Sequence, residues 1–243
     1  MLTSLSTIKR GKKLKSAPLE VTESLIMNHE LGIDWKTLPS YLRPTHASFL
    51  LSDFVIRQVR HGSSCVELGC GAGAVALTLA RSGRFHHVVG IDRDHEAVSI
   101  ARELYHKLKL EIIVEFLEMD MSDVRRSLSA ESFDVAVMNP PFHLKGQPSF
   151  DPKRNAVRSG DMKTVKNFIE AAVYLLKNRG ELYMVVKPSV AMEFVEIMLT
   201  KAAEPKSIQP VYGRGNREAF LLLIKAIKNG GRELHVLPPI ILS

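Results

Sequence analysis

Short apolar runs alternate with segments of helical periodicity from about residue 46 onward. Apolar positions at helical spacing predict helices over residues 46–60, 74–81, 94–108, 165–176 and 190–200. Runs rich in Val, Ile and Leu predict strands over residues 64–68, 87–92, 111–117, 133–138, 181–186, around 211–212 and over 219–227. Because strands and helices alternate, the sequence predicts an α/β fold: a mostly parallel, seven-stranded sheet with helices on both faces.

The start of the chain differs from the rest, because it lacks this apolar periodicity and is rich in Lys, Ser and Thr. We therefore expect residues 1–40 to form a basic N-terminal extension that is partly flexible. Residues 41–243 are expected to form one domain, since no composition shift or internal repeat divides them. Asp94 stands immediately before a helical segment, where it is expected to cap the helix.

The composition is that of an ordinary soluble globular protein, not of a disordered or fibrous chain: 45% of the 243 residues are hydrophobic and 24% are charged. Apolar stretches are too short to span a bilayer, and we expect neither a secretory signal nor a membrane partner. Cys65 and Cys70 are the two cysteines, too few for a disulfide framework or a four-cysteine zinc site. A reducing, cytoplasmic location is the expectation.

The net charge of +7 is concentrated in two stretches. The first fifteen residues hold five basic residues and no acid, and residues 143–166 hold six basic residues against two acids. A solvated tail or a transit peptide is an alternative interpretation of the first stretch, but both stretches fit an anionic partner such as RNA. The candidate RNA-binding residues are Lys9, Arg10, Lys12, Lys13, Lys145, Lys153, Arg154 and Arg158.

A glycine loop follows the first strand of the expected domain. Gly69, Gly71 and Gly73 separate this strand from a helix, and Asp92 lies nineteen residues further on, at the tip of the next strand. Glycines there allow a tight turn and a close approach to a ligand, while the acid can bind ribose hydroxyls. Glu67 would repel a pyrophosphate but suits a ligand with an ammonium and a sulfonium. A dinucleotide therefore stays the alternative to S-adenosylmethionine.

The strand over residues 133–138 ends in Asn139, Pro140, Pro141 and Phe142. Two prolines fix the backbone and remove two N–H donors, which leaves a rigid pair of acceptors beside an aromatic face. Such a pair can hold both N–H bonds of a planar amine while the ring stacks. The acceptors would pull the nitrogen toward tetrahedral geometry and free its lone pair for methyl transfer, with no metal and no strong base.

Two motifs carry a family resemblance. V-E-L-G-C-G-A-G resembles the first motif of the class I S-adenosylmethionine-dependent methyltransferases, and N-P-P-F resembles the N/D-P-P-Y/F/W of amino-group methyltransferases. The resemblance implies a Rossmann-like fold with S-adenosylmethionine as cofactor. The implied catalytic residues are Asn139, Pro140, Pro141 and Phe142. The implied cofactor-binding residues are Glu67, Gly69, Cys70, Gly71, Gly73, Asp92, Arg93, Asp120, Met121 and Asn139; no metal is implied.

The C-terminal residues 229–242 resemble the G-G-x-x-x-L-x-V-x-P-P-L-I-x tail of the bacterial adenine-N6 methyltransferases that modify valine tRNA. The likeness covers about residues 46–242 and implies N6 methylation of adenine in RNA, with tRNA preferred. Three alternatives stay open: a guanine-N2 ribosomal RNA enzyme, since His143 follows N-P-P-F as in that group; a glutamine-N5 release-factor enzyme; and a catalytically silent RNA-binding protein.

Overall fold

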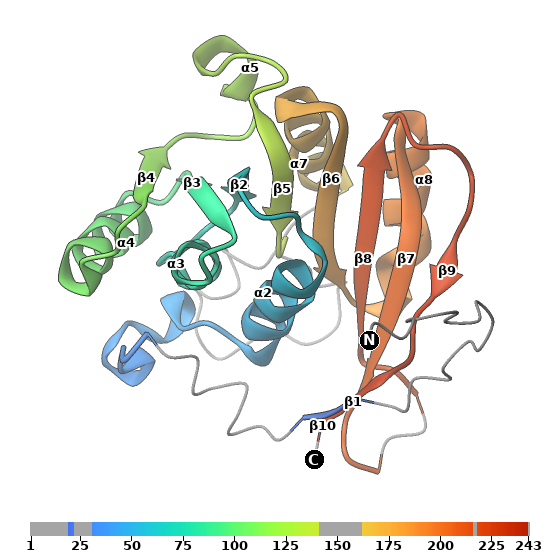
Figure 1. Cartoon of the computed structure of the whole chain (residues 1–243), viewed down its shortest axis with the longest axis horizontal. Helices are drawn as coiled ribbons and strands as arrows, with labels where there is room; N and C mark the ends of the chain where they lie inside the picture. The colour runs from blue at the N-terminus through green and yellow to red at the C-terminus, as the bar shows by residue number, and fades with distance from the viewer. Residues whose placement is uncertain (1–18, 22–30, 141–161, 216–217, 243) are drawn as a thin grey trace, which may run out of the picture.

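The computed structural model describes residues 19–21, 31–140, 162–215 and 218–242. Its centre is a single twisted sheet (Figure 1). The strands are β1 (Leu19–Val21), β2 (Ser63–Leu68), β3 (Phe85–Asp92), β4 (Ile113–Glu118), β5 (Phe133–Met138), β6 (Leu176–Val186), β7 (Ala203–Tyr212), β8 (Leu221–Lys228), β9 (His235–Val236) and β10 (Ile240–Leu242). The described part therefore has ten strands instead of the expected seven. The three strands that the sequence did not predict, β1, β9 and β10, are only two or three residues long.

The strand order is β1-β10-β7-β8-β6-β5-β2-β3-β4, with β9 also paired to β7. Pairing is parallel throughout except at β8, which runs antiparallel to both β6 and β7. The prediction of a mostly parallel α/β sheet is confirmed. Since β8 reverses direction once on each side, β7, β10 and β1 run the same way as β2 to β6.

Helices cover both faces of this sheet (Figure 1). They are α2 (His46–Gln58), α3 (Ala74–Arg81), α4 (His95–Leu108), α5 (Val124–Ser127), α7 (Met162–Leu175) and α8 (Ala191–Thr200), with 3-10 turns at Trp35–Thr37, Ser40–Leu42 and Pro188–Val190. The side chain of Asp94 accepts the N–H groups of Glu96 and Ala97, which confirms the predicted cap of α4.

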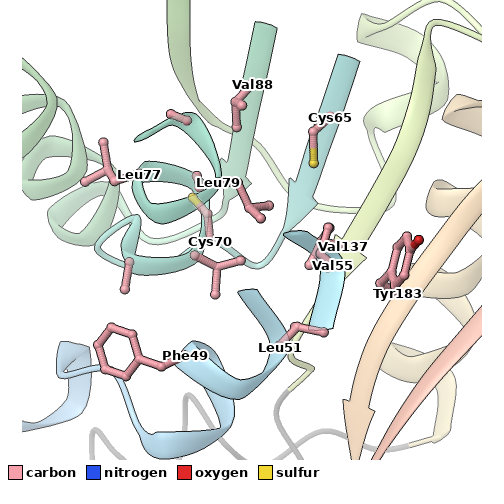
Figure 2. Packing of buried hydrophobic residues seen from close by; sticks show 14 of the residues in the cluster. Phe49, Leu51, Val55, Cys65, Cys70, Leu77, Leu79, Val88, Val137 and Tyr183 are labelled. Carbon is pink, nitrogen blue, oxygen red and sulfur yellow. The ribbon is translucent and has the colours of Figure 1, made fainter. Parts of the chain in front are cut away.

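Alternate residues of the central strands enter two separate cores, as the two-residue period of a strand requires. Val135 and Val137 of β5 pack in the core that contains α2, α3 and α4, whereas Ala136 and Met138 pack in the core that contains α7 and α8. Figure 2 shows the first of these cores, with Leu51 of α2 in the same cluster as Val137. The layers are therefore helix, sheet and helix.

The segment before α2 contributes to the first core. Leu31 and Trp35 are buried there, and the Trp35 ring lies 6.4 Å from that of Phe49, centroid to centroid. β1 pairs with β10 near the C-terminal end of the chain. The domain boundary at residue 40 stays a prediction. Leu31 and Trp35 precede that boundary and are nevertheless buried in the core. No helix of the described segments is long and apolar enough to cross a membrane.

Candidate functional site

Neighbouring parallel strands end side by side at one edge of the sheet, the edge where open α/β folds bind ligands. Leu68 at the end of β2 pairs with Ile91 of β3 on one side and with Met138 of β5 on the other. The glycine loop, Asp92 and Asn139 therefore follow directly on three adjacent strand ends. The fold thus brings these three parts of the predicted site together.

The glycine loop is bound to β3 by its own backbone. The N–H groups of Gly69 and Cys70 both donate to the carbonyl oxygen of Ile91, at 2.8 and 3.0 Å. The N–H of Gly71 donates to Oδ2 of Asp92 at 2.8 Å, and that of Gly73 to the Cys70 carbonyl at 2.9 Å. The loop is thus held in one shape by hydrogen bonds from successive residues.

Two of the three glycines are required by sterics as well as by conformation. Gly69 has φ +75° and Gly73 φ +82°, a region that costs other residues about 1–2 kcal/mol. A Cβ on Gly69 would lie 2.9 Å from the Phe168 ring of α7, and one on Gly73 2.8 Å from the Phe116 ring of β4. At Gly71 a Cβ would meet none of the described residues within 4 Å, so these residues leave the space above the middle of the loop open.

The Asp92 carboxylate joins the glycine loop to the start of α4. Oδ2 accepts the N–H of Gly71, and Oδ1 accepts the N–H of Asp94 at 3.0 Å. Burial raises the pKa of Asp92, although these two N–H groups act in the opposite direction. Each oxygen keeps a further lone pair, so the carboxylate can still accept hydroxyl groups from a ligand.

Glu67 lies beneath the loop and is 2% exposed. Its Oε2 accepts the N–H of Ala76 in the first turn of α3 at 2.8 Å, which satisfies one of the N–H groups that have no partner within the helix at that end. Burial raises its pKa strongly, and the charge of Asp92 raises it further. The structure therefore gives Glu67 a role in fixing the loop to α3, and its predicted contact with a cofactor stays a prediction.

The other predicted cofactor residues surround the same edge. Asp120 follows β4, and the N–H and hydroxyl of Ser122, which both donate to its Oδ1, lower its pKa. Met121 and Cys70 are buried and Arg93 is exposed. Burial raises the pKa of the Cys70 thiol, which keeps it protonated and unreactive. Their contacts with a cofactor remain predictions.

At the end of β5, Asn139 is half-buried and Pro140 is buried. The side-chain Nδ2 of Asn139 donates to Oγ of Ser48 in the first turn of α2, at 3.3 Å. Ser48 was not predicted as a site residue, because it lies in a different element far away in the sequence. The available signal was a serine at a buried position of an apolar helix, since such hydroxyls are generally hydrogen-bonded.

Several predicted residues fall outside the described part of the chain. These are Pro141 and Phe142 of the N-P-P-F motif and all eight candidate RNA-binding residues: Lys9, Arg10, Lys12, Lys13, Lys145, Lys153, Arg154 and Arg158. Their predicted roles stay predictions.

The sequence also did not predict that the segment before α2 lies beside the glycine loop. Leu42 is buried against Ala72 of the loop and Ala97 of α4, with Leu38 packed on the same cluster. The Tyr41 hydroxyl donates to a carboxylate oxygen of Glu96 in α4. This segment therefore forms one wall of the site.

The observed groups fit a nucleoside that carries positive charge. The space over Gly71 that the described residues leave open admits a ligand close to the backbone, Asp92 offers acceptors for ribose hydroxyls, and the carboxylates of Asp92 and Asp120 favour a cation. S-adenosylmethionine has these properties. Within the described ranges, no group of three or more His, Cys, Asp and Glu side chains could hold a metal ion.

Comparison with known proteins identifies the fold and the chemistry. Residues 45–205 match the family model described as the methyltransferase small domain, which is more than half of the chain. Among solved structures, a protein from Agrobacterium tumefaciens described as a predicted O-methyltransferase superposes with a TM-score of 0.64 at 22% identity. The match covers 80% of this chain and 86% of that one. At that identity the likeness shows a shared class I methyltransferase fold.

Curated relatives fall into different substrate classes. An rRNA N(6)-adenosine-methyltransferase from Caenorhabditis elegans is 33% identical over 90 residues, covering 37% of this chain and 42% of the relative. A tRNA1(Val) (adenine(37)-N6)-methyltransferase from Aeromonas salmonicida is 27% identical over 160 residues, covering 65% and 66%. A release factor glutamine methyltransferase from Geobacter sulfurreducens is 26% identical over 136 residues, covering 55% and 45%. The chain thus covers somewhat less than half the length of the rRNA adenosine methyltransferase and of the release factor methyltransferase.

Proposed function

We propose that this chain, which belongs to the methyltransferase small domain family, is an S-adenosylmethionine-dependent enzyme that methylates the exocyclic N6 amine of an adenine in RNA, most readily in tRNA. The observation that carries the proposal is the position of Asn139. Its half-buried side chain follows β5 directly beside the glycine loop, with its amide nitrogen already engaged by Ser48. Among the described residues its amide oxygen has no hydrogen-bond donor, and we assign it as the acceptor at the strand end.

An acceptor at that position suits an amine. The exocyclic nitrogen of adenine is a weak nucleophile because its lone pair is delocalised into the ring. Asn139 Oδ1 and the carbonyl oxygen of Pro140 accept its two N–H groups and stabilise the positive charge that develops on nitrogen. Two prolines in sequence keep that carbonyl in a fixed direction, since each ring locks its own φ.

When bound, S-adenosylmethionine supplies a methyl group on a positively charged sulfur. The nitrogen lone pair forms the new N–C bond as the S–C bond breaks, and the methylated nitrogen then loses one proton to water. Asp92 would hold the nucleoside end of the cofactor beside the backbone of Gly71, and Asp120 would keep its surroundings negative, while Glu67 fixes the loop to α3 through the N–H of Ala76. In our proposal Phe142 stacks on the target base, which is flipped out or already unpaired in a loop.

RNA as the substrate is supported by the distribution of charge. The two basic stretches at residues 1–15 and 143–166 account for more than the whole net charge of +7. The second stretch directly follows the N-P-P-F motif in the sequence, so we expect its positive charges to lie near the RNA backbone around the reacting base. Two relatives named for adenine N6 of rRNA or tRNA favour adenine over guanine. Such a substrate would place the reaction in the cytoplasm.

A protein substrate is the second candidate, because release factor glutamine methyltransferases match the same region. A glutamine side chain also presents a planar NH₂ to two acceptors, so the geometry at Asn139 serves both. The charge distribution separates them: a basic surface is required for an RNA backbone and not for a single amide.

Nucleoside mass spectrometry on cells with and without the gene tests the proposal. We expect N6-methyladenosine to fall in tRNA of the deletion strain and to return with the wild-type gene, but not with an Asn139→Ala gene. Loss of N2-methylguanosine from ribosomal RNA, or loss of methylglutamine from a release factor with all nucleosides unchanged, would contradict it.

A further inference from the structure

We infer that Ser48 is a positioning residue for methyl transfer, whose hydroxyl oxygen holds the Asn139 amide so that the amide oxygen faces the incoming amine. The contact that carries this inference is the 3.3 Å hydrogen bond from Asn139 Nδ2 to Ser48 Oγ. The inference rests on the proposed function, in which Asn139 is an acceptor.

An asparagine amide needs such a partner because its two ends are nearly equal in size and opposite in hydrogen-bonding character. The oxygen accepts and the NH₂ donates, and the terminal torsion has two broad minima about 180° apart. In one minimum the amide oxygen of Asn139 faces the substrate NH₂ and can accept its N–H. In the other minimum the amide NH₂ faces the substrate NH₂, and no hydrogen bond forms between two donors. Only the first orientation can draw the nitrogen toward tetrahedral geometry.

Ser48 can hold the amide in that orientation because its own backbone position is fixed. It is 9% exposed and lies in the first turn of α2, where its N–H donates to the carbonyl of Thr45 at 3.0 Å. Phe49, Leu50 and Leu51, which follow it, are 0–2% exposed and anchor the helix in the core. The hydroxyl oxygen is therefore a fixed point supplied by one element for a side chain supplied by another.

The same contact connects the acceptor to the segment that forms a wall of the site. α2 begins at His46, immediately after the segment whose Leu42 packs on the glycine loop. A shift of this segment would move Ser48 and with it the Asn139 amide. Through Ser48, the packing of this segment beside the cofactor loop therefore affects the orientation of the Asn139 amide.

Kinetics of three variants test the role. Ser48→Ala removes the hydrogen bond, whose net free energy is that of a neutral pair, so we expect kcat to fall about 3- to 10-fold. The KM for S-adenosylmethionine should stay within about 2-fold, because no cofactor contact is changed. Ser48→Thr keeps the hydroxyl and should recover most of kcat. Ser52→Ala is the matched control: its hydroxyl is also buried in α2 and donates to the Ser48 carbonyl at 3.0 Å, and it should leave kcat unchanged.

The side-chain NH₂ resonances of Asn139 give a second readout that needs no substrate. They are assigned in a ¹⁵N-labelled protein by comparison with Asn139→Ala. We expect slow hydrogen exchange in the wild type and in Ser52→Ala, and fast exchange in Ser48→Ala. Because a serine hydroxyl can also donate, fast exchange in the wild type would mean that it contacts the amide oxygen instead, and this would overturn the inference.

The outcomes separate this inference from the proposed function. A wild-type chain that methylates no RNA contradicts the proposed function. An active wild-type chain with equal kcat in Ser48→Ala overturns the role of Ser48 alone. A loss of kcat of the same size in Ser48→Ala and Ser52→Ala also overturns it, because α2 would then act only through its packing.

Discussion

The two halves of the site, on either side of the end of β2, are held in different ways. In the cofactor half (residues 67–73 with Asp92), four loop N–H groups have acceptors within the chain, and both carboxylates accept backbone N–H groups. In the acceptor half (Asn139, Pro140 and Ser48), one side-chain hydrogen bond joins the reacting edge to α2. Among the described residues, the first half is therefore fixed by many hydrogen bonds and the second by one.

This difference predicts how each half responds to substitution. A substitution that removes one hydrogen bond of the cofactor half leaves the others in place, so each such substitution should reduce cofactor affinity only in part. In the acceptor half we propose that Asn139 acts on the reacting amine, so damage there should appear mainly in kcat and little in cofactor affinity. The following predictions are ordered by the size of the expected effect.

The largest effect is expected in the acceptor half, from Asn139→Ala. It removes an acceptor aimed at the charge that develops in the transition state, and comparable single deletions cost about 100- to 1,000-fold in kcat. Asn139→Asp keeps a side-chain acceptor and should retain more activity than Ala. Single-turnover methyl transfer measures the loss, and calorimetry should show a cofactor Kd within about 2-fold of wild type. A cofactor Kd that rises in parallel with the loss of kcat would remove the distinction between the halves.

In the cofactor half, Asp92→Asn should have the largest effect. It removes the charge and one acceptor from a group that tethers Gly71 and Asp94, and hydrogen bonds to charged groups contribute about 1.5–3 kcal/mol. We expect S-adenosylmethionine to bind on the order of 10- to 100-fold more weakly by calorimetry, with kcat at saturating cofactor little changed.

The same carboxylate gives a pH dependence whose sign follows from its raised pKa. As pH falls, Asp92 protonates earlier than an ordinary Asp and loses acceptor capacity, so cofactor affinity should fall with decreasing pH.

The contribution of Asp92 to the free energy of unfolding responds to pH in the opposite direction. Between the unfolded and the raised folded pKa the native chain holds the proton more tightly, so the contribution of Asp92 to stability falls as pH rises. If Asp92→Asn keeps the full pH dependence of affinity, Glu67 is the group responsible.

A smaller effect is expected from Gly69→Ala. The new Cβ would meet the Phe168 ring at 2.9 Å in a backbone with φ +75°, so we expect a loss of about 1–3 kcal/mol in the free energy of unfolding and a severalfold weaker cofactor Kd. Gly83→Ala is the matched control: its φ is +69° and its Cβ would meet nothing within 4 Å. Denaturant unfolding of Gly83→Ala should show only the backbone cost, with cofactor affinity intact. Equal cofactor affinity in both variants would show that the loop tolerates a shift.

The smallest effect on chemistry is expected from deletion of residues 1–15, which hold five basic residues. The logarithm of RNA affinity should then depend less steeply on the logarithm of salt concentration, by about 0.7–0.9 for every phosphate that these residues neutralise in the full chain. Cofactor Kd and kcat at saturating RNA should not change. An unaltered salt dependence would mean that the stretch is a solvated tail.

Local signals predicted the cofactor half well. The glycine loop, Asp92 at the tip of β3 and the Asp94 cap all depend on residues near one another in the sequence, and the structure places them as expected. β7 was recognised only at Val211 and Tyr212, because Pro205 and Pro210 lack the N–H groups that a strand donates. Pairing with β8 on one side and with β9 and β10 on the other overrides that preference.

The acceptor half could be predicted only in part. The acceptor Asn139 follows from the residues around it, whereas its partner Ser48 lies on another element and is adjacent only in the folded chain. The packing of Leu42 on Ala72 was missed for the same reason. Contacts between distant segments are specified by the whole packing arrangement, which no local pattern contains.

The central claim is tested most directly with the purified chain, bulk tRNA and S-adenosylmethionine that carries a deuterated methyl group. After digestion to nucleosides, mass spectrometry reports which base received the label. We predict N6-methyladenosine with the three-deuterium mass increase in the wild-type reaction, and none with Asn139→Ala. Label in N2-methylguanosine, or an unlabelled nucleoside pool from a chain that binds the cofactor, would contradict the proposed function.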